Sequence, residues 1–120
     1  MFRHALVALL LFCVVAPLQA AEPLRLGLNY PSTGNYKSEG LELRRGALLA
    51  IDQINSQGGV LGRPLQLISL NSAARAEKAT ANVERFAAQN VHMIFGGANR
   101  AEALAAGQRA RGVGLLDFPT

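Results

Sequence analysis

Cysteine is almost absent from this sequence of 120 residues, and the single one, Cys13, lies inside an apolar run near the amino terminus. If that run is removed during export, the remaining chain has neither a disulfide nor a thiol nucleophile. Cys13 also follows Phe12, where a lipidated cysteine would follow a small residue. The cysteine content therefore excludes thiol chemistry from the exported chain and argues against a lipid anchor.

Long hydrophobic runs are missing as well, since a membrane-spanning helix takes about twenty apolar residues. The apolar run from Ala5 to Val15 is shorter, follows the basic Arg3 and is ended by Pro17. Leu18-Gln19-Ala20 then offers a cleavage site. This arrangement is typical of a secretory signal peptide, which we predict over residues 1–20, with a retained anchor as the alternative.

Charged residues make up only 17% of the chain, and the formal net charge is +4. The basic residues are scattered singly apart from Arg44-Arg45. A scattered excess of this size indicates a solvated surface, because nucleic-acid-binding domains gather their basic residues into a patch or stripe. We therefore predict no nucleic-acid partner.

Residues suited to catalysis or metal binding are also scarce after residue 20. The one histidine there, His92, lies within an apolar segment, where a core residue is expected more often than a base. No loop carries a pair of carboxylates, and no GxGxxG or GxxxxGK[ST] motif occurs. We expect neither an enzyme, nor a metal site, nor a bound cofactor.

Apolar, strand-like segments alternate with amphipathic, helix-like segments along residues 21–120. Strands are predicted at Leu24–Tyr30, Leu65–Leu70, Val91–Phe95 and Val113–Phe118. Helices are predicted at Glu39–Gln57, Ala74–Gln89 and Arg100–Arg111. The first helix has an apolar stripe made of Leu43, Ala47, Ala50, Ile51 and Ile54. Such alternation indicates an α/β fold, a parallel sheet with helices on both faces.

The expected ligand site follows from this topology. Sheets of this kind bind ligands beyond the carboxyl ends of the strands, where the strand order reverses. If the first strand is central, that point lies between the first and third strands. The loops that leave it are Pro31–Ser38 and Gly96–Arg100, and each leads into a helix whose first turn has free amide donors.

The order and spacing of several short motifs carry a family resemblance. The motifs are Thr33-Gly34, Gly40, Arg44-Arg45-Gly46-Ala47, Ile51-Asp52-Gln53-Ile54-Asn55, Gly58-Gly59-Val60-Leu61-Gly62-Arg63-Pro64, the helix Ala79–Asn90 and Phe95-Gly96-Gly97. With them the chain resembles the type I periplasmic solute-binding proteins of branched-chain amino acid and amide uptake systems. The resemblance implies a periplasmic, non-enzymatic receptor that closes two α/β lobes around a small polar solute. It would deliver that solute to the membrane permease of an ABC transporter, as a monomer when complete.

The resemblance also implies which residues contact the solute. In the family, the loop after the third strand usually offers Ser or Thr to a ligand carboxylate, where this chain has Asn99 and Arg100. An aromatic residue often precedes the glycine matched by Gly40, where this chain has Glu39. Arg100 is suited to a carboxylate, and Glu39 to an amine or a hydroxyl. The predicted ligand-binding residues are Tyr36, Glu39, Gly97, Ala98, Asn99, Arg100 and Thr120.

Structural roles are open for several of these residues. Glu39 can serve only to stabilise the first turn of its helix, and Asn99 can cap the next helix. Asn99 and Glu102 have the spacing of a capping box. Arg100 and Tyr36 can lie on a solvated surface.

The length of the chain bears on its function. The family has two lobes, and residues 21–120 match the N-terminal part of the first, with the second lobe absent. We interpret the chain as truncated, and predict that alone it binds solute weakly or not at all. The alternatives are the extracellular ligand-sensing domain of a signalling receptor and a non-functional gene fragment.

Overall fold

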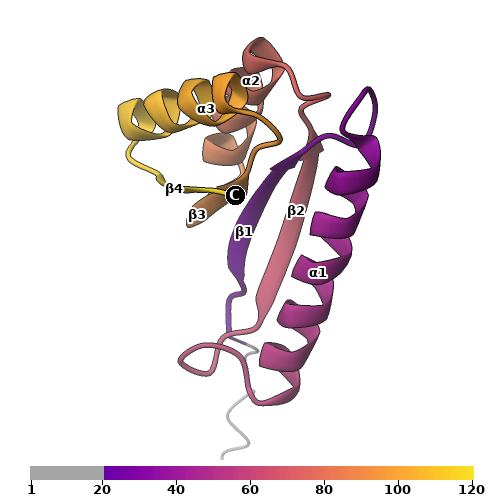
Figure 1. Ribbon diagram of the computed structural model, residues 1–120. Helices are drawn as coiled ribbons and strands as arrows, with labels where there is room; N and C mark the ends of the chain where they lie inside the picture. Colours follow the sequence, from indigo (N-terminus) through magenta and orange to yellow (C-terminus); the bar gives the residue numbers. More distant parts are fainter. Residues whose placement is uncertain (1–20) are drawn as a thin grey trace, which may run out of the picture.

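The structure is a computed structural model that describes residues 21–120, and the predicted signal peptide lies outside the described residues. The elements, shown in Figure 1, are β1 (Leu24–Tyr30), α1 (Lys37–Ser56), β2 (Leu65–Asn71), α2 (Ala76–Ala88), β3 (Met93–Gly96), α3 (Arg100–Val113) and β4 (Leu116–Pro119). Within residues 21–120, no helix is long and apolar enough to cross a membrane.

The four strands form one parallel sheet in the order β2-β1-β3-β4. Leu28 of β1 is paired with Ser69 of β2 on one side and with Phe95 of β3 on the other. The α/β fold, the parallel sheet and the central position of β1 are thus confirmed. The strand order reverses between β1 and β3, which is where the ligand loops were expected.

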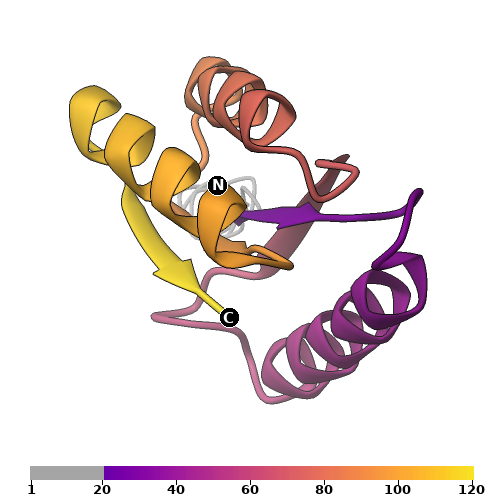
Figure 2. The same cartoon turned by 45° about the horizontal axis from the view of Figure 1, so that its top comes forward.

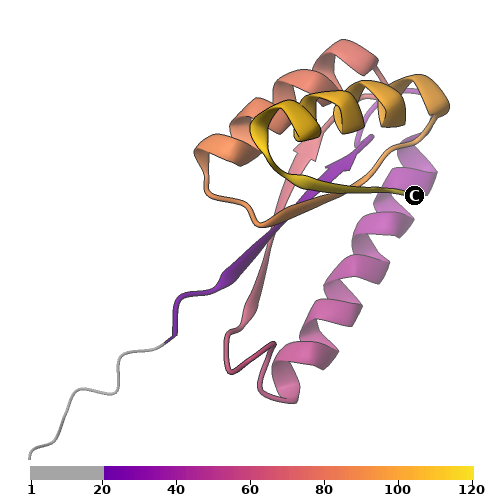
Figure 3. The same ribbon diagram turned by 90° about the vertical axis from the view of Figure 1, so that its left-hand side faces the viewer.

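Helices cover the two faces of the sheet unequally. Figures 2 and 3 show α1 on one face and α2 with α3 on the other. The hydrophobic core lies on the face of α2 and α3, and contains Ala79, Val83, Phe86, Val91, Ile94, Ala106 and Ala110. Phe86 packs directly over β1, because a Cβ atom on Gly27 would lie 2.9 Å from its ring. Alternate residues of β1 and β3 therefore point into this core.

The face of α1 is less completely covered. In α1 only Gly40 is buried. Of the predicted apolar stripe, Leu43, Ala47 and Ile51 are half-buried, whereas Ala50 and Ile54 are exposed. Figure 1 shows α1 beside β1 and β2, leaving β4 without a helix on this face. Accordingly, Leu116 and Phe118 keep 65% and 52% of their surface exposed.

Several boundaries differ from the sequence prediction by one to three residues. α1 begins at Lys37 instead of Glu39, and β3 begins at Met93 instead of Val91. α2 begins at Ala76 instead of Ala74, because Ala73 and Ala74 have left-handed φ angles of 49° and 56° that end any regular structure there. β4 begins at Leu116 instead of Val113, because α3 continues through Val113 before Gly114 caps it. The shift of α1 places Lys37 and Ser38, the last two residues of the predicted loop, in the helix.

Candidate functional site

A cleft of about 300 Å³ lies beyond the carboxyl ends of β1, β3 and β4. Its walls come from the loop after β1, the first turns of α1, the loop after β3 and the residue after β4. The lining residues are Pro31, Tyr36, Glu39, Gly40, Leu43, Gly97, Ala98 and Thr120. The two loops proposed from the sequence therefore share one cleft.

The structure brings five of the seven predicted ligand-binding residues to this cleft, namely Tyr36, Glu39, Gly97, Ala98 and Thr120. Asn99 and Arg100 are not among the lining residues. The Asn99 side chain instead caps α3, by accepting a hydrogen bond of 2.9 Å from the Glu102 amide. Arg100 lines a different cavity. Solute contact by the five lining residues stays a prediction.

That second cavity, of about 470 Å³, lies between α3 and β4. Arg100, Arg111 and Asp117 contribute its charged groups, over a wall that includes Leu104 and Leu116. It is larger than the cleft, but it runs along the edge strand and its apolar walls are open, since Leu104 keeps 54% of its surface exposed. The smaller cleft is the candidate ligand site, because only that one joins the loops at the strand-order reversal.

Burial raises the pKa of Asp117 in the larger cavity, and the nearby Arg111 partly opposes this by lowering it. Among residues 21–120 no group of His, Cys, Asp or Glu side chains is placed to hold a metal ion. The charged groups of this cavity are the guanidinium groups of Arg100 and Arg111 and the half-buried carboxyl group of Asp117.

Two glycines allow the walls of the cleft to approach each other. A Cβ atom on Gly40 would lie 1.9 Å from the carbonyl oxygen of Pro31, so the first turn of α1 touches the end of β1. Gly96 has a φ of 119°, and a Cβ atom there would lie 2.1 Å from the carbonyl oxygen of Asn29. Any side chain at either position would push a loop away from β1.

A buried glutamate fixes the loop after β3. Glu102, in the first turn of α3, is completely buried, and its Oε2 accepts a hydrogen bond of 2.9 Å from the amide of Ala98. The predicted capping box is therefore shifted, because in that motif the carboxylate would bind the amide of the capping residue Asn99. The amide of Ala98, a lining residue, is occupied from inside the protein.

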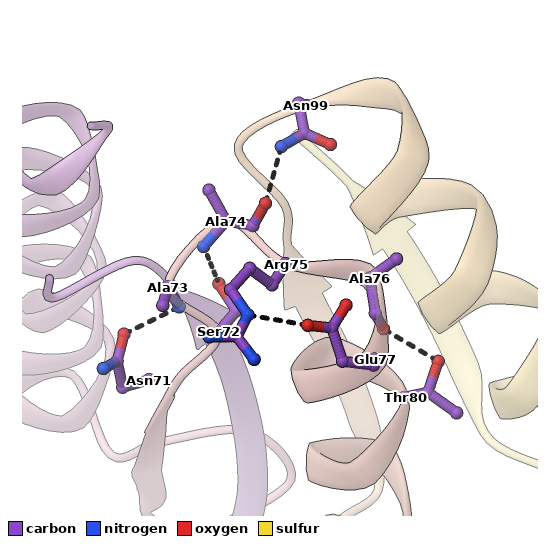
Figure 4. Close-up of polar contacts among 9 residues, drawn as sticks. All are labelled: Asn71, Ser72, Ala73, Ala74, Arg75, Ala76, Glu77, Thr80 and Asn99. Atoms are coloured by element: carbon purple, nitrogen blue, oxygen red, sulfur yellow. Dashed lines mark hydrogen bonds and ion pairs between the residues drawn. The ribbon is translucent and has the colours of Figure 1, made fainter. Parts of the chain in front are cut away.

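The turn between β2 and α2 connects the two ligand loops. The Asn71 side chain accepts hydrogen bonds from the amides of Ser32 (2.9 Å) and Ala73 (2.8 Å), and donates to the Thr33 hydroxyl. Figure 4 shows the other end of this turn, where Asn99 donates to the carbonyl oxygen of Ala74 over 2.9 Å. The turn is thus held to the loop after β1 by Asn71 and to the loop after β3 by Asn99.

A buried amide pair supports this turn from below. Asn82 of α2 donates to the side-chain oxygen of Asn29 in β1 and to the carbonyl oxygen of Asn71. Asn29 in turn donates to the carbonyl oxygen of Ala79. Both side chains are almost completely buried, so water cannot take the place of these hydrogen bonds. The bonds therefore hold both amide groups in one orientation.

Sequence reasoning missed Asn71 and Glu102 as residues that position the loops. For Asn71 a signal was present, since an amide residue directly follows the apolar segment Leu65–Leu70 at the edge where ligands bind. For Glu102 the spacing to Asn99 predicted a capping role, but not which amide it would bind. The difference depends on the sharp backbone turn at Gly96 and Gly97, which local spacing does not determine.

The sequence of this chain is similar to those of known proteins. A sequence model described as periplasmic binding protein matches residues 23–120. The Leu/Ile/Val-binding protein homolog 7 of Brucella melitensis is 29% identical over 119 residues, which is 98% of this chain and 30% of that protein. The chain thus spans between a fifth and a third of the length of the curated relatives that it matches.

Solved structures share the fold. The branched-chain amino acid transporter substrate binding protein LivJ of Streptococcus pneumoniae, in complex with isoleucine, superimposes with a TM-score of 0.77 at 23% identity. The match covers 82% of this chain and 28% of that one. A fatty acid ABC transporter substrate-binding protein of Thermomonospora curvata gives a TM-score of 0.76 at 22% identity, and the match covers 82% of this chain and 25% of that one.

Proposed function

Because the chain belongs to the periplasmic binding protein family, we propose that it forms part of the first lobe of the substrate-binding component of an ABC transporter. In this role it is a non-enzymatic periplasmic receptor that captures a small polar solute. The solute is then passed to a membrane permease. The observation that carries this proposal is the single cleft formed by the loops after β1 and β3 at the strand-order reversal.

The residues that line the cleft suit reversible binding of a solute better than catalysis. The cleft is lined by small and apolar residues with few polar groups, which can bind and orient a solute. Capture in such receptors depends on closure, in which the solute favours the closed state through contacts made only there. The residues supplied by this chain form one wall of such a clamp, with Gly97 and Ala98 opposite Tyr36 and Glu39.

The fold does not determine the solute. The two solved structures with this fold carry names that refer to branched-chain amino acids in one case and to fatty acids in the other. The solute class therefore has to follow from the lining residues of this chain. Tyr36 and Leu43 offer apolar contact, and Glu39 is the one acidic lining residue.

Titration of the full chain, followed by the amide signals in its two-dimensional NMR spectrum, tests the proposal. We expect leucine, isoleucine, valine, short amides or urea to shift the signals of Glu39, Gly97 and Ala98 with millimolar affinity, since one wall makes only part of the contacts. Ala98→Phe should abolish these shifts by filling the cleft. Ala105→Phe, on α3 and away from the cleft, is the matched control and should keep them.

Two outcomes count against the proposal. If the solutes shift signals elsewhere in the chain but not those of the cleft residues, the cleft is not the solute site. If shifts occur but Ala98→Phe leaves them unchanged, the solute binds elsewhere.

A further inference from the structure

The charge of the cleft is one-sided. Of its lining residues, Glu39 is the acidic one and none is basic. Arg100, which the sequence suggested for a ligand carboxylate, lines the cavity between α3 and β4 with Arg111. Glu39 takes part in none of the ion pairs of the described residues, which join Arg45 to Glu42, Arg75 to Glu77 and Arg109 to Glu84. Its carboxylate is therefore available to a solute.

The two amides of the facing loop that belong to lining residues, those of Gly97 and Ala98, are already occupied. The amide of Gly97 donates to the carbonyl oxygen of Asn29 over 3.1 Å. The amide of Ala98 donates to Oε2 of Glu102 over 2.9 Å. The hydroxyl of Thr120 donates to the carbonyl oxygen of Gly97. A carboxylate entering the cleft would find none of these three donors free.

Glu102 also places a carboxylate directly behind this loop. The side chain is completely buried, and its second oxygen, Oε1, has no hydrogen-bond partner. The positive end of the α3 dipole, which could otherwise attract an anion, thus already faces an acidic group of the protein. At the other wall, Glu39 lies in the first turn of α1, so the positive end of that helix dipole also faces an acidic side chain.

From these contacts we infer that the cleft selects the hydrogen-bond-donating end of a solute, a primary ammonium or an amide NH₂, and rejects a carboxylate. This rests on the proposed function. Glu39 is the specificity-determining contact, because its carboxylate accepts hydrogen bonds from the donor group. Glu102 is a positioning residue that withholds the Ala98 amide from anions.

The net charge of the chain opposes the proposed preference for an ammonium group, so non-specific electrostatic attraction cannot explain it. The formal net charge is +4, so a weak, non-specific effect would favour an anionic solute over a cationic one. A preference for ammonium therefore has to come from the local charge of the cleft.

Three probes with one branched carbon skeleton test the inference by NMR titration of the full chain: 3-methylbutylamine, 3-methylbutanamide and 3-methylbutanoate. We expect the amine to shift the signals of Tyr36, Glu39 and Ala98 with at least a tenfold lower Kd than the carboxylate, a difference of about 1.4 kcal/mol. The amide should fall between them.

Two variants assign the preference to residues. Glu39→Gln keeps the shape of the side chain and should reduce the amine-to-carboxylate ratio to about threefold or less. Glu42→Gln, one turn along the same helix and outside the cleft, is the matched control and should leave the ratio unchanged. Glu102→Gln keeps an oxygen for the Ala98 amide, which stays occupied, so any gain in affinity for the carboxylate should come only from the lost charge behind the loop.

The outcomes separate this inference from the proposed function. If the carboxylate shifts the cleft signals with equal or higher affinity than the amine, the inference is wrong and the receptor role stands. If the preference persists in Glu39→Gln, Glu39 does not determine it. If the probes and the solutes of the earlier titration shift signals only outside the cleft, the cleft is not the solute site and both proposals fail together.

Discussion

The two faces of the sheet differ in how firmly they hold the walls of the cleft. On the face of α2 and α3, Phe86, Val83 and Ile94 are completely buried in one continuous core. On the face of α1 the contact is thinner, and Leu49 keeps 61% of its surface exposed. The loop after β3 therefore extends from the rigid side of the molecule, and the first turn of α1 from the more weakly packed side.

This difference indicates how the cleft can be both preformed and adjustable. Gly97 and Ala98 are fixed by β1, Glu102 and the α3 cap, so we expect this wall to keep its shape. The opposite wall depends on the close approach of Gly40 to Pro31 and on the hydrogen bonds of Asn71. Local opening in proteins starts where few apolar contacts hold an element, which points to α1.

The largest effect should come from the core of the well-packed face. Phe86→Ala removes the ring that packs over Gly27, and should lower the free energy of unfolding by about 3–5 kcal/mol. Leu49→Ala, on the exposed side of α1, should change it by less than about 0.5 kcal/mol. Urea unfolding followed by circular dichroism measures both. Equal losses for the two variants would contradict the unequal packing of the faces.

A second pair of variants tests how α1 is attached. Gly40→Ala should lower the free energy of unfolding by about 2–3 kcal/mol, because the new Cβ would meet the carbonyl oxygen of Pro31. Gly46→Ala lies in the same helix with nothing within 4 Å of its Cβ, and should raise stability by about 0.5–1 kcal/mol. If both substitutions were stabilising, the close approach of Gly40 to Pro31 would not hold the first turn of α1.

A third experiment concerns the turn between β2 and α2. Asn71→Ala removes the acceptor for the amides of Ser32 and Ala73, and should cost about 1–2 kcal/mol. It should also speed hydrogen exchange at these two amides. Asn71→Asp keeps the oxygen that accepts from both amides, and its second oxygen can accept from the Thr33 hydroxyl, so it should restore most of the protection. Unchanged exchange in Asn71→Ala would show that Asn71 does not hold the loop.

The smallest effect should be the pH dependence that Asp117 adds at the edge of the sheet. Burial raises its pKa in the folded chain, so its contribution to stability is complete at acid pH and is lost as the pH rises through that folded pKa. Asp117→Asn should therefore be slightly more stable than the parent at pH 7, by under about 0.5 kcal/mol. The two proteins should converge below about pH 4. If the difference in stability between the two proteins were larger at acid pH than at pH 7, the folded chain would lower the pKa of Asp117 instead of raising it.

Much of the fold followed from the sequence because it depends on local pattern and chain handedness. The alternation of strands and helices predicted the parallel sheet with its right-handed crossovers. The central position of β1 was an assumption, and the strand order agrees with it. The loops that carry Tyr36, Gly97 and Ala98 could be assigned to one edge because the carboxyl ends of parallel strands meet there, whereas Glu39 was named only through the family resemblance.

What the sequence did not reveal depends on side-chain direction and on contacts between distant elements. Asn99 and Arg100 are adjacent to the lining residues, yet the one turns to Ala74 and the other to the cavity of Asp117. The role of Asn71 depends on the loop after β1, which is distant in the sequence. Helix capping and loop contacts compete for the same side chain, and only the three-dimensional arrangement decides between them.

One measurement tests most directly the claim that both loops form a single cleft. A nitroxide attached at Lys37→Cys, in a Cys13→Ser background, lies at the start of α1 and broadens amide signals of nearby residues. We predict strong broadening of Gly97 and Ala98, and little broadening of Gln89 and Asn90 at the amino-terminal end of β3. If Ala98 is broadened no more than Asn90, the two loops do not meet, and the assignment of a shared solute cleft is wrong.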